Sequence, residues 1–419
     1  MNAFTEKNGE LHAEQVPLRE IARHYGTPCF VYARAALEGA WRELDRAFGD
    51  APHLVCYAVK ANSNLGVLDI LARCGAGFDI VSGGELARVL AVDAGAAART
   101  IFSGVGKSAD EMRAALEAGV LSINVESAQE LERLQQVAAH MGVTAPVALR
   151  INPDVDARTH PYIATGLNQN KFGIAAADVR EVYRRAADMP NLRVTGMACH
   201  IGSQLLELAP FTASVERVLQ LARQLQDDGA VLEHLDLGGG LGVRYRDETP
   251  PAPAEYVAAL LGVLRKQRMK VKVLIEPGRV VAAAAGVLLT RVEYLKRNQA
   301  KHFAVVDAAM NDLLRPALYG AWQEIRPVKT VGEAPEYTCD VVGPVCESAD
   351  FLGAGRPLRA APGDLLAVMT CGAYAAVMSS NYNTRPRAAE VVVDGARHFL
   401  TRRRESVESL FAGETVLPR

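Results

Sequence analysis

The chain has 419 residues, of which 49% are hydrophobic and 22% are charged. This profile is typical of a folded globular protein and excludes a largely disordered one, and the length favours two domains. The formal net charge of -2 argues against a surface that binds nucleic acid through its charge.

Local patterns exclude further classes of protein. The first residues show no basic region followed by an apolar stretch, so no signal peptide is expected. The apolar run Val280–Leu289 is too short to span a membrane. The seven cysteines contain no C-x-x-C pair and the nine histidines no H-E-x-x-H pattern. We therefore expect reduced thiols in a cytoplasmic protein, and no catalytic metal.

Before about residue 285 the chain alternates between helix-like and strand-like segments. Leu18–Tyr25 predicts an amphipathic helix, Cys29–Tyr32 a short strand and Arg34–Phe48 a second helix. Short apolar, β-rich runs then predict eight strands: Leu54–Val59, Phe78–Val81, Thr100–Phe102, Leu121–Val125, Val147–Ile151, Val194–Cys199, Leu232–Leu237 and Val271–Ile275. Most of them are separated by helix-like segments, which is the signature of an α/β fold with a (β/α)8, TIM-like barrel.

The pattern changes after about residue 285. Six runs predict strands separated by turns: Val287–Tyr294, Phe303–Val306, Tyr337–Val342, Asp364–Met369, Ala389–Val393 and His398–Thr401. The only comparable helix is expected at Met310–Leu318. We therefore predict a barrel over residues 30–284, and a mainly β domain formed by residues 1–29 and 285–419.

The most informative stretch is Tyr57–Asn62, where an apolar strand ends in a single lysine, Lys60. Desolvation lowers the pKa of a lysine and leaves the neutral amine that can form a Schiff base. We hypothesise that Lys60 carries pyridoxal phosphate. Taken alone, the stretch favours a plainer interpretation, a lysine at a strand end that extends its ammonium into water.

Other barrel strands also end in polar residues or glycine. Lys60 ends the first strand and Asp79 lies within the second, while the fifth to eighth strands end in Arg150, His200, Asp236 with Gly238–Gly240, and Glu276. Active sites of (β/α)8 enzymes lie at the carboxyl ends of the strands, so this ring of residues predicts one site there.

Four residues or stretches at or near these strand ends have both a specific interpretation and a plainer alternative. Gly238–Gly242 offers backbone amides to a phosphate, or is a flexible turn. Glu276 can keep a pyridine nitrogen protonated, or form an ion pair with Arg279. His200 can lie against a cofactor ring or only be hydrogen-bonded, and Ser203 can bind phosphate or cap the next helix.

Several motifs resemble, in order, those of the fold-type III pyridoxal-phosphate-dependent decarboxylases, whose barrel is of the alanine racemase type. They are Tyr57–Asn62, His200–Gln204, Gly238–Gly242, Glu276–Arg279, Cys346–Asp350 and Gly372–Tyr374. Met310–Tyr319, and Met378–Asn383 followed by Arg385-Pro386-Arg387, narrow the resemblance to the diaminopimelate decarboxylase group. The resemblance covers nearly the whole chain.

The resemblance implies a set of cofactor-binding residues. Lys60 would carry pyridoxal 5'-phosphate, Glu276 would face its pyridine nitrogen and His200 would stack on its ring. The full implied set is Lys60, Asp79, His200, Ser203, Gly239, Gly240, Glu276, Pro277, Gly278, Arg279 and Tyr374.

It also implies a substrate site and a reaction. Substrate would be bound by Arg279, Arg315, Tyr319, Glu347 and Tyr374, and Cys346 would supply a proton. In this family Cys346 and Glu347 come from the second subunit, so the implied active unit is a homodimer. The implied reaction converts meso-2,6-diaminopimelate into L-lysine and carbon dioxide. A related decarboxylase acting on carboxynorspermidine, ornithine or arginine is the alternative.

Overall fold

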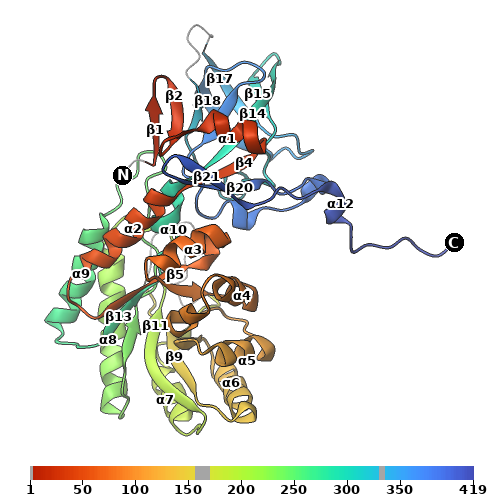
Figure 1. Cartoon of the computed structure of the whole chain (residues 1–419). Coiled ribbons are helices and arrows are strands. Elements are labelled where there is room, and N and C mark those ends of the chain that lie inside the picture. Colours follow the sequence, from red (N-terminus) through yellow and green to blue (C-terminus); the bar gives the residue numbers. More distant parts are fainter. Residues whose placement is uncertain (1–2, 156–169, 330–335) are drawn as a thin grey trace. The chain divides into compact units, whose positions relative to one another are not determined.

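The computed structural model describes residues 3–155, 170–329 and 336–419, coloured from red to blue along the chain in Figure 1. The chain divides into two compact units. One comprises residues 40–244 and 248–281, and the other residues 1–39, 245–247 and 282–419. A hypothesis drawn from Gly166 and Gly173 in the sequence, that the Asn152–Gly173 loop acts as a lid, concerns a loop that lies mostly outside the described residues.

The first unit contains a closed barrel of eight parallel strands, as the sequence predicted. In barrel order they are β5 (His53–Ala58), β6 (Gly77–Ile80), β7 (Thr100–Phe102), β8 (Ser122–Val125), β9 (Ala145–Asn152), β11 (Leu192–Cys199), β12 (His234–Asp236) and β13 (Lys272–Ile275). Pairing of β13 with β5 and of β8 with β9 closes the ring. The short strand β10 (Ile174–Ala175) adds to β9.

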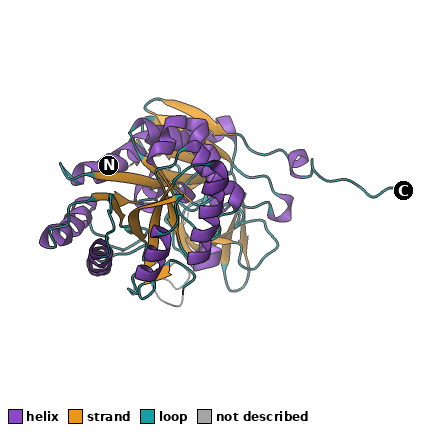
Figure 2. Ribbon diagram, turned by 90° about the horizontal axis from the view of Figure 1, so that it is seen from below, coloured by secondary structure: helices purple, strands orange, loops and turns teal. Residues whose placement is uncertain are grey.

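Helices surround these strands, as Figure 2 shows. They are α3 (Leu65–Arg73), α4 (Gly83–Val92), α5 (Ala109–Ala118), α6 (Ala128–Met141), α7 (Val179–Ala187), α8 (Ala209–Asp227) and α9 (Pro253–Lys266), with the shorter η1 (Val59–Ala61), η2 (Ala94–Arg99) and α10 (Arg279–Ala282). Local sequence fixes several ends: Ser108 and Glu111 form a capping box at the start of α5, and Gly119 ends it in the left-handed conformation. These caps fix where α5 begins and ends.

The second unit is mainly β. Its three-stranded sheet consists of β1 (Phe4–Lys7), β2 (Glu10–Ala13) and β3 (Val16–Pro17). Its larger sheet has the order β18 (Phe351–Leu358), β17 (Tyr337–Val342), β15 (His302–Val306), β14 (Gly286–Arg297), β4 (Cys29–Ala33), β20 (Ala389–Asp394) and β21 (Arg397–Arg402). From β14 it branches through β19 (Leu365–Val368) to β16 (Ile325–Pro327).

The short helices of this unit are α1 (Leu18–Tyr25), α11 (Arg315–Tyr319), α12 (Val407–Leu410), η4 (Ala283–Ala285), η5 (Ala376–Met378) and η6 (Tyr382–Thr384), while α2 (Arg34–Ala47) begins in this unit and ends in the barrel unit. One detail differs from the sequence prediction. The helix expected over Met310–Leu318 forms only at α11, because residues 310–312 form a turn in which the Asp312 side chain accepts from the Ala309 amide. Strand β4 pairs with β14 and β20 in this unit. The assignment of residues 30–284 as the cofactor-binding domain stays a prediction.

Across the described ranges, no helix is both long and apolar enough to cross a membrane.

Candidate active site

Lys60 lies just beyond the carboxyl end of β5, in the 3-10 turn η1 rather than in the strand itself. Its Nζ donates to Oδ2 of Asp79 on β6 at 2.5 Å. The Asp79 side chain is fully buried, whereas that of Lys60 is 34% exposed. The amine is therefore held by a buried carboxylate and still reachable from solvent, as a lysine that must react with a small molecule requires.

Glu276 follows β13 and is buried inside the barrel. Ser103, which follows β7, donates its hydroxyl to Oε1 of Glu276 at 3.3 Å. Burial is the main cause that raises the pKa of Glu276 well above its usual value, and the carboxylates of Asp236 and Asp79 raise it further. A carboxyl that holds its proton at neutral pH can share that proton with a basic ring nitrogen.

The glycine-rich loop after β12 is packed against backbone on all sides. A Cβ on Gly238 would lie 2.4 Å from the Cys199 carbonyl oxygen, and one on Gly239 would lie 2.1 Å from the Glu276 carbonyl oxygen. A Cβ on Gly240 would lie 2.4 Å from the Gly202 carbonyl oxygen. Glycine is thus required here first by close packing of the strand ends, a reason that the sequence pattern alone did not reveal.

His200 stands directly after β11, and its Nδ1 accepts from the amide of Gly239 at 3.2 Å. This bond places the ring proton of the neutral imidazole on Nε2. Burial lowers the pKa of His200 well below its usual value, and the positive charges of Lys60 and Arg150 lower it further. The ring is therefore neutral at physiological pH.

The amides of the loop are not equivalent. That of Gly238 donates to Oδ1 of Asp236 and that of Gly239 to His200. Among the described residues, the Gly240 amide has no acceptor. Of these three amides, Gly240 is therefore the one available to an anionic ligand.

Arg279 begins α10 and is 7% exposed. Its Nη2 donates to the Ser203 hydroxyl at 3.0 Å. Ser203 does not cap a helix, because α8 begins only at Ala209. Next to Arg279, Gly278 packs against Ala58 and Ala61, and the Pro277 carbonyl accepts from the Ala58 amide at 3.1 Å. These contacts join the segment after β13 to the segment that carries Lys60.

One residue at this rim, Glu126, was not singled out from the sequence. Glu126, which follows β8, accepts from Nη1 of Arg150 at 2.6 Å and from the Gly104 amide at 3.1 Å. Its other oxygen accepts from the amide of Gly173 at 3.0 Å. Glu126 thus connects three neighbouring segments of the rim. Its only sequence signal was its position one residue after a predicted strand.

The remaining predicted site residues lie in the mainly β unit. Arg315 and Tyr319 are the first and last residues of α11, so the expected i, i+4 spacing on a helix is present. Arg315 is buried, and its guanidinium lies 4.5 Å from the centre of the Tyr245 ring. This contact orients a positive charge that a substrate carboxylate can use.

Cys346 and Glu347 are exposed and contact two residues of η6. The Cys346 Sγ lies 3.4 Å from Nδ2 and 3.5 Å from Oδ1 of Asn383. The hydroxyl of Tyr382 donates to Oε2 of Glu347 at 3.2 Å. Asp350 anchors the same loop, because its carboxylate accepts from the Val345 amide at 2.7 Å.

Tyr374 is half-buried and has a left-handed backbone with φ 53°. It follows Gly372, where a Cβ would lie 1.8 Å from the Ala282 carbonyl oxygen. Only glycine allows this approach, which fixes the start of the turn that carries Tyr374.

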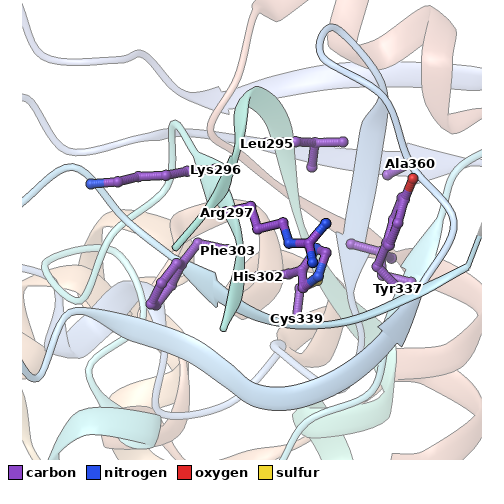
Figure 3. A pocket seen from close by; sticks show the side chains of 9 residues that line it. Leu295, Lys296, Arg297, His302, Phe303, Tyr337, Cys339 and Ala360 are labelled. Atoms are coloured by element: carbon purple, nitrogen blue, oxygen red, sulfur yellow. The ribbon is translucent and has the colours of Figure 1, made fainter. Parts of the chain in front are cut away.

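Figure 3 shows a cavity of about 220 Å³ in the same unit. It is lined by Leu295, Lys296, Arg297, His302, Phe303, Tyr337, Cys339, Leu358 and Ala360. None of these is a predicted site residue, so we do not assign the active site to this cavity.

Comparison with known proteins agrees with this geometry. Residues 34–283 match the family model described as the pyridoxal binding domain of pyridoxal-dependent decarboxylases. The chain is 58% identical to a diaminopimelate decarboxylase of Vibrio cholerae, over 99% of this chain and 98% of the relative. The chain belongs to the diaminopimelate decarboxylase family. The resemblance inferred from the motifs is thereby confirmed.

Two solved structures of the family have the same fold. The Helicobacter pylori diaminopimelate decarboxylase complexed with L-lysine superposes with a TM-score of 0.90 at 39% identity, covering 95% of this chain and 99% of that chain. The M. jannaschii diaminopimelate decarboxylase in complex with L-lysine superposes with a TM-score of 0.94 at 34% identity, covering 100% of this chain and 98% of that chain. The predicted fold class is therefore confirmed.

Membership of the family makes the chain a carboxy-lyase with pyridoxal phosphate as its cofactor. The residues of the barrel unit fit that cofactor. They provide an amine on Lys60, a buried carboxyl on Glu276, a neutral ring on His200 and an available amide on Gly240. These are the groups that an aldehyde, a pyridine nitrogen, an aromatic ring and a phosphate need.

Proposed function

We propose that the chain decarboxylates meso-2,6-diaminopimelate to L-lysine and carbon dioxide, the last step of lysine biosynthesis. The observation that carries the proposal is the reactive lysine, Lys60, at the carboxyl end of a barrel strand and hydrogen-bonded to buried Asp79. Full-length similarity to diaminopimelate decarboxylases supports the choice of substrate.

The barrel unit supplies the cofactor site in this proposal. The cofactor, once bound, provides an electron sink for the electron pair left when carbon dioxide departs. Glu276 would face the pyridine nitrogen and keep it protonated, and the neutral ring of His200 would stack on the pyridine ring. Asp79 takes up the ammonium charge of Lys60 and keeps its amine oriented.

The phosphate group needs a neutral or positive, hydrogen-bonding surface. Arg279 and Ser203 are already hydrogen-bonded to each other at 3.0 Å and present a guanidinium and a hydroxyl together. The Gly240 amide and the backbone of Gly278 complete the proposed phosphate site, with Gly239 fixing its geometry through His200.

The mainly β unit supplies the substrate-binding residues. Diaminopimelate has two amino-acid ends, so a site for it needs a second carboxylate-binding group and a group for the distal ammonium. Arg315 and Tyr319 suit the carboxylate, with Arg279 and Tyr374 contacting the substrate near the cofactor. Glu347 suits the distal ammonium.

We assign Cys346 as the donor of the proton that replaces the lost carboxylate. Its thiol is exposed and hydrogen-bonded to Asn383, and an exposed position is reachable by a second chain. The active unit in this proposal is a homodimer in which each chain contributes Cys346 and Glu347 to the other. All seven cysteines are free thiols, which supports a reducing, cytoplasmic compartment.

The test is release of carbon dioxide from meso-diaminopimelate by cofactor-loaded protein, with lysine identified as the second product. Equal amounts of both products are expected from the wild type, and Lys60→Ala should abolish turnover. Near-normal decarboxylation by Lys60→Ala would overturn the mechanism. Release from carboxynorspermidine instead of diaminopimelate would move the assignment to the polyamine-type alternative.

A further inference from the structure

Asp236 is a buried carboxylate at the end of β12, with only 1% of its surface exposed. Its Oδ1 accepts from the amide of Gly238 at 3.0 Å, and its Oδ2 accepts from Nδ2 of Asn124 at 3.1 Å. It is also hydrogen-bonded to the carboxyl of Glu276. One side chain therefore connects the glycine-rich loop, strand β8 and the segment after β13.

These contacts belong to a closed ring of hydrogen bonds. The Asn124 side-chain amide lies within hydrogen-bonding distance of two acceptors, Asp236 and the hydroxyl of Ser103 at 3.2 Å. The Ser103 hydroxyl in turn donates to Glu276 at 3.3 Å. The bond between Glu276 and Asp236 closes the ring. All four side chains are buried, so each bond is made without competition from bulk water.

The ring determines where its proton lies. Two carboxyl groups can be hydrogen-bonded to each other only if one of them carries a proton. Asp236 also accepts from Gly238 and Asn124, and such bonds favour its charged form. The proton therefore belongs to Glu276, which donates to the charged Asp236.

The neighbouring charges are consistent with this arrangement. Asp79 on β6 raises the pKa of both carboxyls, while Lys60 after β5 lowers that of Glu276. Burial is the largest cause for both, and it raises the pKa of Asp236 to about 6. The nearby Cys56 thiol on β5 has its own pKa raised by burial and by these carboxylates, so it adds no charge.

We propose that Asp236 is a positioning residue that acts through Glu276. Its hydrogen bonds hold the Glu276 carboxyl in register with the glycine-rich loop, and its negative charge makes Glu276 a stronger proton acceptor. With its own proton donated to Asp236, Glu276 would accept from the N–H of a ring nitrogen that it faces, and the negative charge of Asp236 would raise the affinity of that nitrogen for its proton. The inference rests on the proposed function, in which Glu276 faces the pyridine nitrogen.

The experiment compares visible absorption spectra of the cofactor bound to wild type, Asp236→Asn, Glu276→Gln and the double variant, as the pH is varied without substrate. In Asp236→Asn the pH at which the spectrum changes should fall by about one unit or more, because a full charge next to Glu276 is lost. If Asp236 acts through Glu276, adding Asp236→Asn to Glu276→Gln should cause little further change in the spectrum.

The same variants are then assayed with substrate. For Asp236→Asn, kcat should fall about tenfold or more while KM stays within about twofold of the wild-type value, since a positioning residue acts on the reacting centre.

The matched control is Asp312→Asn. Asp312 is also buried, burial raises its pKa to about 6, and it belongs to the mainly β unit. The control substitution should leave the spectral titration unchanged. Asp236→Asn places two amide groups next to each other at Asn124, so this variant could fail to fold. A second variant therefore combines Asp236→Asn with Asn124→Asp, which restores the hydrogen bond between positions 124 and 236 with its direction reversed. This pair moves the negative charge away from Glu276 and should still show the shifted titration.

The outcomes separate the inference from the function on which it rests. A wild type without cofactor absorption would refute the proposed function. A wild type that binds the cofactor, with Asp236 variants that titrate as it does, would refute only the inference. So would additive effects of Asp236→Asn and Glu276→Gln on the spectrum.

Discussion

His234 makes the barrel sensitive to acid. It lies on β12, and its ring occupies the space left by Gly196 on β11, where a Cβ would lie 2.4 Å from Nε2. Within the described residues, Nε2 has no hydrogen-bond partner. Burial lowers the pKa of His234 from 6.5 to about 4. Folding therefore requires a neutral imidazole at this position.

The sign and size of the effect follow from that pKa. Because the unfolded chain binds the proton more tightly, the stability contributed by neutral His234 is complete above about pH 6.5 and is lost as the pH falls toward 4. The loss should be about 2 kcal/mol at pH 5 and approach about 3 kcal/mol below pH 4. Buried carboxyls with raised pKa values, such as Glu276, act in the opposite direction, so wild type must be compared with a variant.

The assay is urea unfolding of wild type and His234→Gln at about pH 7.5 and about pH 5, followed by a probe of the barrel. Glutamine does not titrate, so the stability difference between the two proteins should change by about 2 kcal/mol in favour of the variant at the lower pH. His140→Gln, at an exposed position on α6, controls for loss of a histidine as such. If wild type and His234→Gln lost stability in parallel, the reasoning would be refuted.

Two further predictions concern the site. Gly239→Ala would bring a Cβ to 2.1 Å from the Glu276 carbonyl oxygen. It should therefore lower the free energy of unfolding, measured in urea, by about 1–3 kcal/mol and weaken cofactor binding. The control is Gly262→Ala on α9, where a Cβ meets no atom within 4 Å; it should stabilise the protein by up to about 1 kcal/mol. Equal effects of the two would count against the packing argument. Asn383→Gly tolerates the backbone φ of 56° but removes the amide beside Cys346, so kcat should fall about tenfold with little change in KM. An unchanged kcat would show that this contact does not orient the thiol.

Much of the fold could be predicted because parallel barrel strands are buried on both faces and therefore form continuous apolar runs. The runs at Leu54–Val59 and Val194–Cys199 are examples, and both are strands of the barrel. Strand β18 was not predicted, since Gly353, Gly355 and Pro357 interrupt its pattern. It forms because β17 provides an antiparallel partner, which is a tertiary contact.

The position of the site could also be predicted, because the carboxyl ends of parallel strands meet at one face of a barrel. The detailed roles came from the motifs and the resemblance, not from the strands. The sequence did not show that Lys60 lies in a 3-10 turn, or that Arg279 is hydrogen-bonded to Ser203. It also gave no reason to connect Cys346 with Asn383, 37 positions later.

The order of the residues was enough to infer the barrel, the lysine at its rim and the family that the chain resembles. Whether Glu276 or Asp236 carries the proton that they share depends on the folded chain. Ser103 and Glu276 are 173 positions apart, and Asn124 and Asp236 are 112 apart. They meet because the closed barrel brings β7, β8, β12 and β13 around one interior. Hydrogen bonds and pKa values depend on distances of a few ångströms, which the order of residues along the chain does not specify.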